Sequence, residues 1–154
     1  MKEKRKKKYK MGFNIWGLIL FFIIMIPNFI WFAIPVPNDV LRKESVTAEL
    51  DMVASVCQIL IAFAICAVIN RESQKTKRIT LFSIITIGCC MLYFGSWIFY
   101  YAGIVNAWII LGLCIFPCFA FLFYALDRKN MVAVVPITIF TICHLAYGIV
   151  NFIW

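Results

Sequence analysis

Long uncharged stretches alternate with short charged ones along this chain. No Asp, Glu, Lys or Arg occurs in four stretches, which are 11–38, 52–70, 79–126 and 130–154. Together they hold 120 of the 154 residues, so every charged side chain lies in the remaining 34. A soluble domain has no way to cover so much uninterrupted apolar chain. The pattern predicts an all-α, polytopic integral membrane protein.

The lengths of these stretches predict the number of membrane spans. A helix rises about 1.5 Å per residue and the hydrocarbon core is about 30 Å thick, so about 20 residues cross once. The stretch 79–126 is long enough for two spans, and we expect its turn at 102–106. There Gly103 can take the left-handed conformation that ends a helix, and Asn106 can cap the next one. The predicted bundle of five transmembrane helices has spans at about 13–36, 51–70, 79–101, 107–126 and 131–152.

The basic residues predict an orientation. The amino-terminal segment 1–12 holds seven of the 15 lysines and arginines, 71–78 holds four and 127–130 holds two. With five spans these segments share one side, and only Arg42 and Lys43 lie on the other. The positive-inside rule then places the amino terminus in the cytoplasm and the carboxy terminus outside. The Lys-, Ile- and Phe-rich composition suits the cell membrane of a bacterium.

The chain divides into a basic cytoplasmic segment, 1–12, and a single transmembrane domain, 13–154. We expect the first span to be a retained signal anchor, because its apolar run exceeds the about 7–15 residues of a cleavable signal. The amino-terminal lysines either enforce topology or also bind anionic lipid at the membrane surface. The net charge of +8 comes with no stacking platform or reading motif, so we expect no nucleic-acid partner.

Prolines mark the irregular places within the spans. Pro27 and Pro117 each lie inside a predicted helix, where the missing N–H and the ring produce a kink. Pro27 cannot bond the carbonyl of Ile23, and Asn28, which follows it directly, could satisfy a freed backbone group. A binding cavity beside the two kinks is one hypothesis, and ordinary kinks satisfied by neighbouring helices are the other.

The longest outer segment, 37–50, is expected to hold the residues that cap the second helix and form its first turn. Ser45 or Thr47 could cap it, and Glu49 and Asp51 fall in its first turn, where carboxylates suit the helix dipole. The dipeptide Asn38-Asp39 follows two prolines and is interpreted as an Asx turn that holds one carboxylate at the outer surface.

Polar residues form a stripe on the fifth span. At 100° per residue the members lie within about 120° of one another; they are Thr141, His144, Tyr147, Gly148 and Asn151. His144 is the only histidine in the chain, and we expect it to be uncharged and to face protein or trapped water. It either bonds a neighbouring helix and specifies packing, or contacts a ligand or relays protons.

The third span carries a second stripe, made of Ser83, Thr86, Cys90, Tyr93, Trp97, Tyr100 and Tyr101. We interpret its aromatic end, from Trp97 onward, as part of an interfacial aromatic belt, and its deeper residues as bonds between helices. Gly88 and Gly95 lie on another face, where a second helix could approach closely.

These stripes predict a polar-lined interior open toward the outside. On the second span, Gln58 is expected to bond Asn28 or Asn151, which lie at a similar depth. The candidate ligand-binding residues are Asn28, Gln58, Tyr93, Thr141, His144, Tyr147 and Asn151.

Several kinds of chemistry are not expected. All seven cysteines lie within predicted spans, where they act as small apolar residues, and no complete metal-ligand set occurs. The chain has no HExxH, GxSxG, P-loop or GxGxxG motif, and apart from Asp51 at the edge of the second span it has no carboxylate inside any predicted span. We therefore predict no catalytic residue, no metal and no cofactor, and interpret the protein as not an enzyme.

Three functions remain. The first is an accessory, immunity or regulatory subunit that acts through helix contacts with another membrane protein or with itself. The second is a binding or transport protein for a lipid or small amphiphile, with a cavity near His144. The third, which the chemistry favours least, is an intramembrane enzyme with His144 as base and Asp39 or Asp51 as its partner, since His144 is expected to lie too deep for these acids. Five spans at this size resemble the tryptophan-rich sensory (translocator) proteins, but the signatures of that family are missing, so we assign no family.

Overall fold

The computed structural model describes residues 8–36, 39–42, 44–73 and 79–154, and this part of the chain contains five helices long and apolar enough to cross a membrane. They are α1 (Ile15–Ala33), α2 (Ala48–Ala67), α3 (Leu81–Tyr101), α4 (Ala107–Asp127) and α5 (Met131–Phe152). Each predicted boundary lies within three residues of the observed one. The predicted all-α bundle is confirmed, and the chain is a multi-pass membrane protein. The basic residues within 1–7 and 74–78, together with Asn38 and Lys43, lie outside the described residues.

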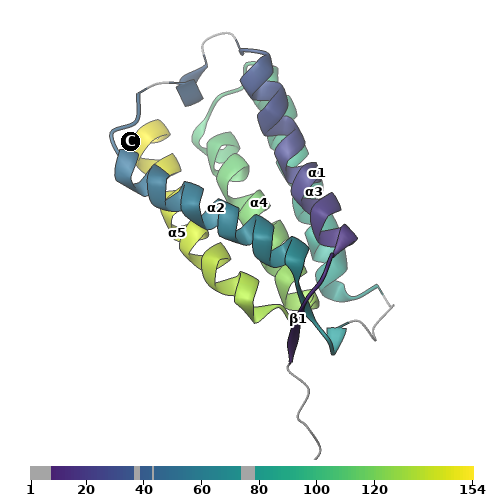
Figure 1. Ribbon diagram of the computed structural model, residues 1–154. Coiled ribbons are helices and arrows are strands. Elements are labelled where there is room, and N and C mark those ends of the chain that lie inside the picture. The colour runs from purple at the N-terminus through teal and green to yellow at the C-terminus, as the bar shows by residue number, and fades with distance from the viewer. Residues whose placement is uncertain (1–7, 37–38, 43, 74–78) are drawn as a thin grey trace, which may run out of the picture.

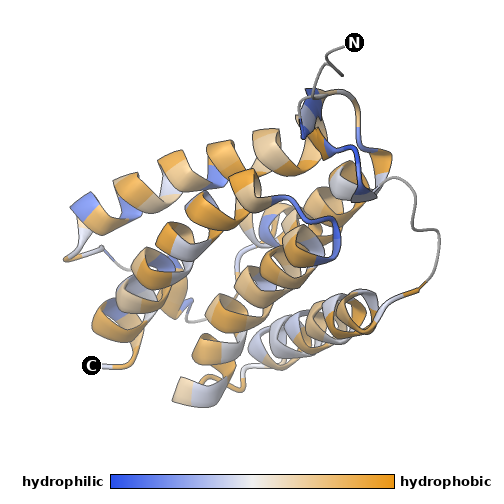
Figure 2. Cartoon of the chain, turned by 90° about the horizontal axis from the view of Figure 1, so that it is seen from below, coloured by the Kyte–Doolittle hydropathy of each residue, from blue (hydrophilic) through white to orange (hydrophobic). Residues whose placement is uncertain are grey.

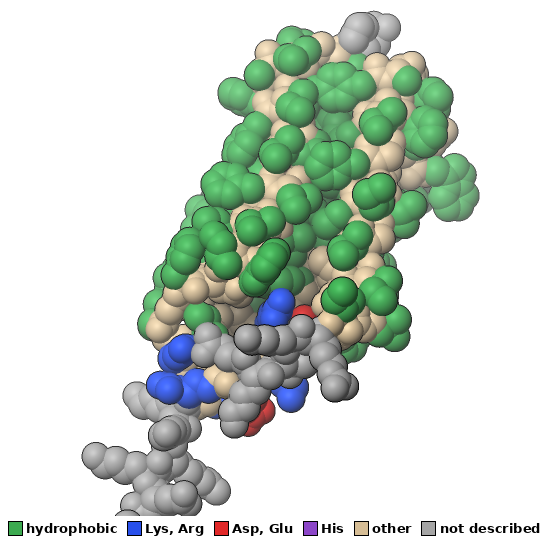
Figure 3. Space-filling model, turned by 90° about the vertical axis from the view of Figure 1, so that its right-hand side faces the viewer, with side chains coloured by type: hydrophobic (Ala, Val, Ile, Leu, Met, Phe, Trp, Pro, Cys, Tyr) green, Lys and Arg blue, Asp and Glu red, His purple; other side chains and the backbone are tan. Residues whose placement is uncertain are grey.

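Helix α4 lies at the centre of the bundle (Figure 1). It packs extensively against α3 and against α5, and it has the largest share of buried residues of the five helices. Helix α2 packs mainly on α5, whereas α1 makes smaller contacts with α2, α3 and α4. Hydrophobic residues predominate along all five helices (Figure 2), and hydrophobic side chains cover most of the helical surface on the face that Figure 3 shows.

Polar side chains begin four of the five helices. The side chains of Asn14, Thr80, Asn106 and Asn130 accept hydrogen bonds from the third residue beyond them, which satisfies a backbone N–H that the helix leaves free. At the predicted turn, Gly103 has φ 81° and Asn106 caps α4. The sequence-based expectation for this turn is therefore confirmed.

A two-stranded antiparallel ribbon was not predicted. Strand β1 (Tyr9–Met11) pairs with β2 (Val68–Asn70), which directly follows α2. The pairing continues toward α1, since Gly12 N donates to Ala67 O at 3.0 Å and Asn14 N donates to Cys66 O at 2.8 Å. The described part of segment 1–12 is therefore packed against the bundle, and the second helix ends before the ribbon begins.

The ribbon lies at one end of the bundle, here called the ribbon end, together with the turn between α4 and α5. Asn70 Nδ2 donates to Lys129 O at 2.9 Å, and Arg71 N donates to Lys8 O at 3.1 Å. The described parts of the three basic segments thus share this end, as predicted, and basic side chains gather there on the face that Figure 3 shows. The segments 39–42, with Arg42, and 44–47 lie at the opposite end (Figure 1).

The predicted close approach at two glycines of α3 is wrong within this chain. A Cβ at Gly88 or Gly95 would meet no atom within 4 Å. Helices come close instead at Gly17, Gly112 and Gly148. A Cβ added at Gly17 would collide with the backbone of Ile65, one at Gly112 with a side chain of α3, and one at Gly148 with a side chain of α4. Small residues therefore allow close packing inside the bundle, on faces that the spacing of Gly88 and Gly95 did not indicate.

Asn130 provides a first testable prediction at the ribbon end. Asn130 is 3% exposed and its side chain caps α5. The side chain also donates through Nδ2 to Ala64 O at 2.9 Å and to Val68 O at 3.0 Å. We expect Asn130→Ala to lower the free energy of unfolding by about 2 kcal/mol, because a cap is lost and two buried carbonyls lose a donor. Equilibrium unfolding in detergent measures this loss. Asn106→Ala is the matched control, since Asn106 caps α4 but is exposed, and a loss no larger than the control's would contradict the prediction.

Candidate functional site

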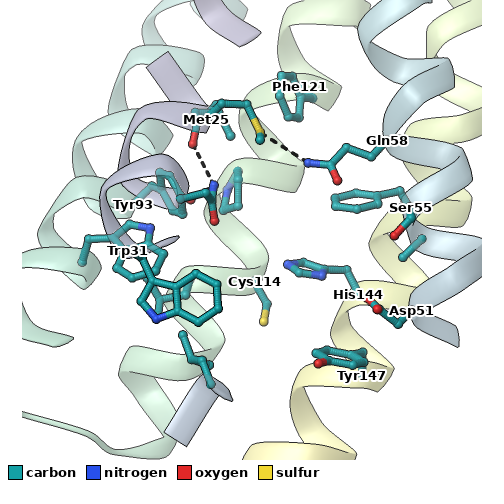
Figure 4. Close-up of a pocket in the computed structure, with 18 of the residues that line it drawn as sticks. Met25, Trp31, Asp51, Ser55, Gln58, Tyr93, Cys114, Phe121, His144 and Tyr147 are labelled. Atoms are coloured by element: carbon teal, nitrogen blue, oxygen red, sulfur yellow. Dashed lines mark hydrogen bonds between the residues drawn. The ribbon is translucent and has the colours of Figure 1, made fainter. Parts of the chain in front are cut away.

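A cavity of about 440 Å³ lies in the half of the bundle away from the ribbon end. All five helices contribute to its wall. Side chains of α1 and α3 lie on one side and those of α2 and α5 on the other, with α4 between them (Figure 4). Such a volume is typical of pockets that hold small ligands.

The structure brings five of the seven candidate residues to this one cavity. They are Asn28, Gln58, Tyr93, His144 and Tyr147, and they come from four different helices. The helical stripes predicted from the sequence therefore do converge on a shared space. Their role as ligand-binding residues stays a prediction.

Asn28 and Tyr93 join α1 to α3 at the cavity wall. Asn28 Nδ2 donates to the Tyr93 hydroxyl at 2.8 Å and also to Ile24 O at 3.1 Å. The expectation that Asn28 could satisfy a group freed by Pro27 is therefore wrong for the carbonyl of Ile23. The carbonyl four residues before Asn28 in the helix is that of Ile24, and the Asn28 side chain bonds this carbonyl. Tyr93 is 2% exposed, so this bond holds a buried hydroxyl in place.

Gln58 faces the cavity from α2, but not with the expected partner. Its Nε2 donates to the Met25 sulfur of α1 at 3.4 Å, rather than to Asn28 or Asn151. A thioether is a weak acceptor, so the amide keeps most of its hydrogen-bonding capacity. Figure 4 shows Gln58 and Met25 pointing toward each other across the space between α2 and α1.

His144 does not hold a neighbouring helix by a hydrogen bond in the described structure. Its ring instead stacks on Phe140, one turn earlier on α5, with ring centroids 4.9 Å apart and an interplanar angle of 15°. One sequence-based interpretation was that His144 bonds a neighbouring helix. Among the described residues, the imidazole nitrogens have no hydrogen-bond partner that would support it. The ring points into the cavity toward α1 and α3 (Figure 4).

Two candidate residues lie outside the cavity lining. Thr141 Oγ1 donates to Ile137 O of its own helix at 2.7 Å. Asn151 accepts from Val46 N at 2.8 Å and donates to Thr47 Oγ1 at 2.5 Å, so it joins the end of α5 to the start of α2. This also explains why Thr47 makes no side-chain capping bond in α2, although it is the N-cap residue. Both side chains are hydrogen-bonded to a backbone group or a hydroxyl, and neither residue lines the cavity.

Most of the cavity wall lies outside the candidate set, including Trp31, Asp51 and Trp97. Trp31 was not singled out, Trp97 was assigned to an interfacial belt, and Asp51 was assigned to the helix dipole and to the least favoured enzyme hypothesis. Trp97 is 6% exposed, and in the described structure its buried indole Nε1 has no hydrogen-bond partner. The signal for Trp97 was its position four residues after Tyr93, on the same helical face.

A cluster around Asp39 closes the opposite end of the bundle beside the cavity. The Asp39 carboxylate accepts from Trp31 Nε1 at 2.6 Å, from the Tyr100 hydroxyl at 2.5 Å and from Arg42 Nε at 3.1 Å. It also accepts from Leu41 N at 3.1 Å, which is the predicted Asx turn. The belt interpretation of the third helix is therefore wrong for Trp97 and Tyr100, because both are buried and Tyr100 holds this carboxylate.

The acids near the cavity differ in what they contact. Asp51 and His144 line the same cavity, but no hydrogen bond joins them in the described structure. Asp39 is already held by Trp31, Tyr100 and Arg42. The described part of the chain has no group of three His, Cys, Asp or Glu placed to hold a metal ion, and its seven cysteines are free thiols.

Comparisons of this chain with protein-family models, with curated proteins and with solved structures each find no match.

Proposed function

We propose that this protein binds a small amphiphile in the cavity beside His144, as a binding or transport protein. The observation that carries the proposal is the convergence of polar groups from four helices on one space of about 440 Å³. A pocket with mostly apolar walls and a few placed polar groups suits a molecule with one polar end and one apolar body. The Gln58 amide lines the cavity and is bonded only weakly, to a thioether, so it can bind the polar end.

The cavity can be blocked without disturbing the bundle. Ser55 lines the cavity from α2 and is exposed, so Ser55→Trp places an indole in the space without burying a new residue in the core. We expect native mass spectrometry of protein extracted in mild detergent to show a bound amphiphile on the wild type. We expect Ser55→Trp to lose most of it, since the ligand and the indole compete for the same volume.

Val56→Trp is the matched control. Val56 is the next residue of α2, is 54% exposed and does not line the cavity. Retention by this variant and loss by Ser55→Trp support the proposal. Equal retention by both variants, or a wild type that carries and accepts no amphiphile, refutes it.

A second candidate function is an accessory subunit acting through helix contacts. The observation in its favour is the uncovered space over Gly88 and Gly95 on α3, where a helix of another membrane protein or of a second copy would fit. A stoichiometric protein partner or self-association after mild purification tests this alternative.

We further propose that the protein lies in a bacterial cell membrane with its ribbon end in the cytoplasm and its carboxy terminus outside. The gathering of Lys8, Lys10, Arg71, Arg128 and Lys129 at that end supports this orientation through the positive-inside rule. Anionic lipid is the expected partner of this end, and nucleic acid is not. In this orientation the cavity lies in the outer half of the membrane.

A further inference from the structure

The side chains around the cavity indicate a class of ligand. Asp51 is the one charged residue among the described residues that line the cavity, and no Lys or Arg lines it. Resting on the proposed function, we infer that the ligand is an organic cation, an amphiphile with one ammonium-type group. Asp51 and the aromatic rings beside it bind that group.

The carboxylate of Asp51 differs from those of Asp39 and Asp127, which are held by side chains at the two ends of the bundle. Asp39 is bonded to Trp31, Tyr100 and Arg42, and Asp127 is bonded to Thr80 and forms an ion pair with Arg128. Asp51 has neither an ion pair nor a side-chain hydrogen bond among the described residues. The positive end of the α2 dipole offsets its charge only in part. A cation in the cavity would therefore find an anion without a competing partner.

Aromatic rings supply the second part of the site. Tyr147 lies next to Asp51 and His144 in Figure 4, and its ring packs edge-on against Phe152 with centroids 5.5 Å apart. Trp97 lines the same cavity. A cation over the face of such a ring is attracted by the ring quadrupole, and the attraction is stronger where water is excluded. One carboxylate and several aromatic rings are the groups that recognise quaternary ammonium ligands.

Charge also disfavours the alternatives. Arg42 is the only described basic residue near this end of the cavity, and its guanidinium is bound to Asp39 and to the Trp31 carbonyl, with Cζ 4.8 Å from the centre of the Trp31 ring. An anionic ligand would meet the Asp51 carboxylate with no free cation to offset it. Asp51 is an exposed residue, so a neutral ligand would leave its carboxylate to solvent and would gain no attraction from it.

Three probes with the same alkyl chain test this inference on the full chain in lipid nanodiscs. They are the decyltrimethylammonium cation, neutral decanol and the decanoate anion, with empty nanodiscs as the reference for partition into lipid. We expect saturable binding with the cation tightest, decanol weaker and decanoate weakest. Tryptophan fluorescence reports binding because Trp31 and Trp97 line the cavity, and equilibrium dialysis gives the affinities.

Removing the charge should change only the binding of the cation. We expect Asp51→Asn to weaken binding of decyltrimethylammonium by about five- to tenfold and to leave decanol unchanged, which corresponds to one partly screened ion pair. Glu49→Gln is the matched control, since Glu49 is an exposed acid in the same turn that does not line the cavity. Asp51→Glu keeps the charge and should keep most of the affinity for the cation.

The outcomes separate this inference from the proposed function. If the wild type binds decanol and the cation equally, or if Asp51→Asn binds the cation as the wild type does, the ligand is not selected by charge and the inference is overturned. In that case binding of decanol that Ser55→Trp abolishes still supports an amphiphile site. If none of the three probes binds saturably, both proposals fail. The comparison on the wild type needs no variant to fold.

Discussion

Replacing Asp39 by alanine is expected to lower the free energy of unfolding by about 3 kcal/mol. The substitution removes the acceptor of the Trp31 indole and of the Tyr100 hydroxyl, whose residue is 0% exposed, and it leaves the Arg42 guanidinium without its carboxylate. Leaving buried donors and a charge unpaired costs more than the net value of the bonds themselves. Because Arg42 is 39% exposed, solvent reduces its share of the loss.

Equilibrium unfolding in mixed detergent micelles measures this effect. Glu44→Ala is the control, since Glu44 is an exposed acid of the same segment, and its unfolding should change by no more than about 0.5 kcal/mol. The fluorescence of Trp31 and Trp97 should also change in Asp39→Ala, because α1 and α3 lose their common partner at this end. A loss of stability equal to that of Glu44→Ala would show that the cluster does not hold the bundle closed.

At the other end of α1, Gly17→Ala is expected to cost about 3 kcal/mol. A Cβ at this position would collide with the carbonyl oxygen of Ile65 and come within 2.9 Å of its carbon, and both atoms belong to the backbone of α2. Overpacking against backbone cannot be relieved by a side-chain rotation, so α1 and α2 have to separate. The separation would also strain the bonds that Asn14 makes to Ile65 O at 3.1 Å and to the Tyr124 hydroxyl at 2.9 Å.

Gly88→Ala is the matched variant for this prediction. The same substitution on α3 meets no atom within 4 Å, so it should leave stability unchanged or raise it by up to about 1 kcal/mol through the better helix propensity of alanine. Thermal unfolding of the two variants side by side gives the difference. If Gly17→Ala and Gly88→Ala unfold at the same temperature, the close approach of α1 and α2 does not matter for stability.

Most of the fold follows from where charge is absent. The five spans could be predicted because in hydrocarbon each stretch of about 20 uncharged residues has to form a helix. The turn at Gly103 and Asn106 could be predicted because each residue acts locally, one through its backbone conformation and the other as a cap. The ribbon could not, since three-residue strands give no periodic signal and their pairing joins residues about sixty positions apart.

The candidate site could be predicted only in part. Helical stripes placed Tyr93 and His144 on inward faces, and the kink at Pro27 drew attention to Asn28, but neither signal tells which neighbouring side chain a residue meets. Gln58 bonds the sulfur of Met25, a residue that looks merely apolar in the sequence. From the sequence, Tyr100 could equally lie in an interfacial belt or inside the bundle, because tyrosine suits both environments. Its burial depends on the position of Asp39, whose carboxylate accepts from the Tyr100 hydroxyl.

The ends of α2 and α5 have a consequence for how the chain is made. Asn130 and Asn151, at the two ends of α5, bind the backbone at the end of α2 and the residues just before its start, respectively. The ribosome completes α2 long before α5, and meanwhile α3 and α4 can pair as neighbours in the chain. During synthesis α2 is therefore in the membrane before α5, the helix against which it mainly packs, has been made. A nascent chain that stops before α5 would expose the face of α2 that packs on α5 to lipid and to the quality-control proteases that remove unassembled spans.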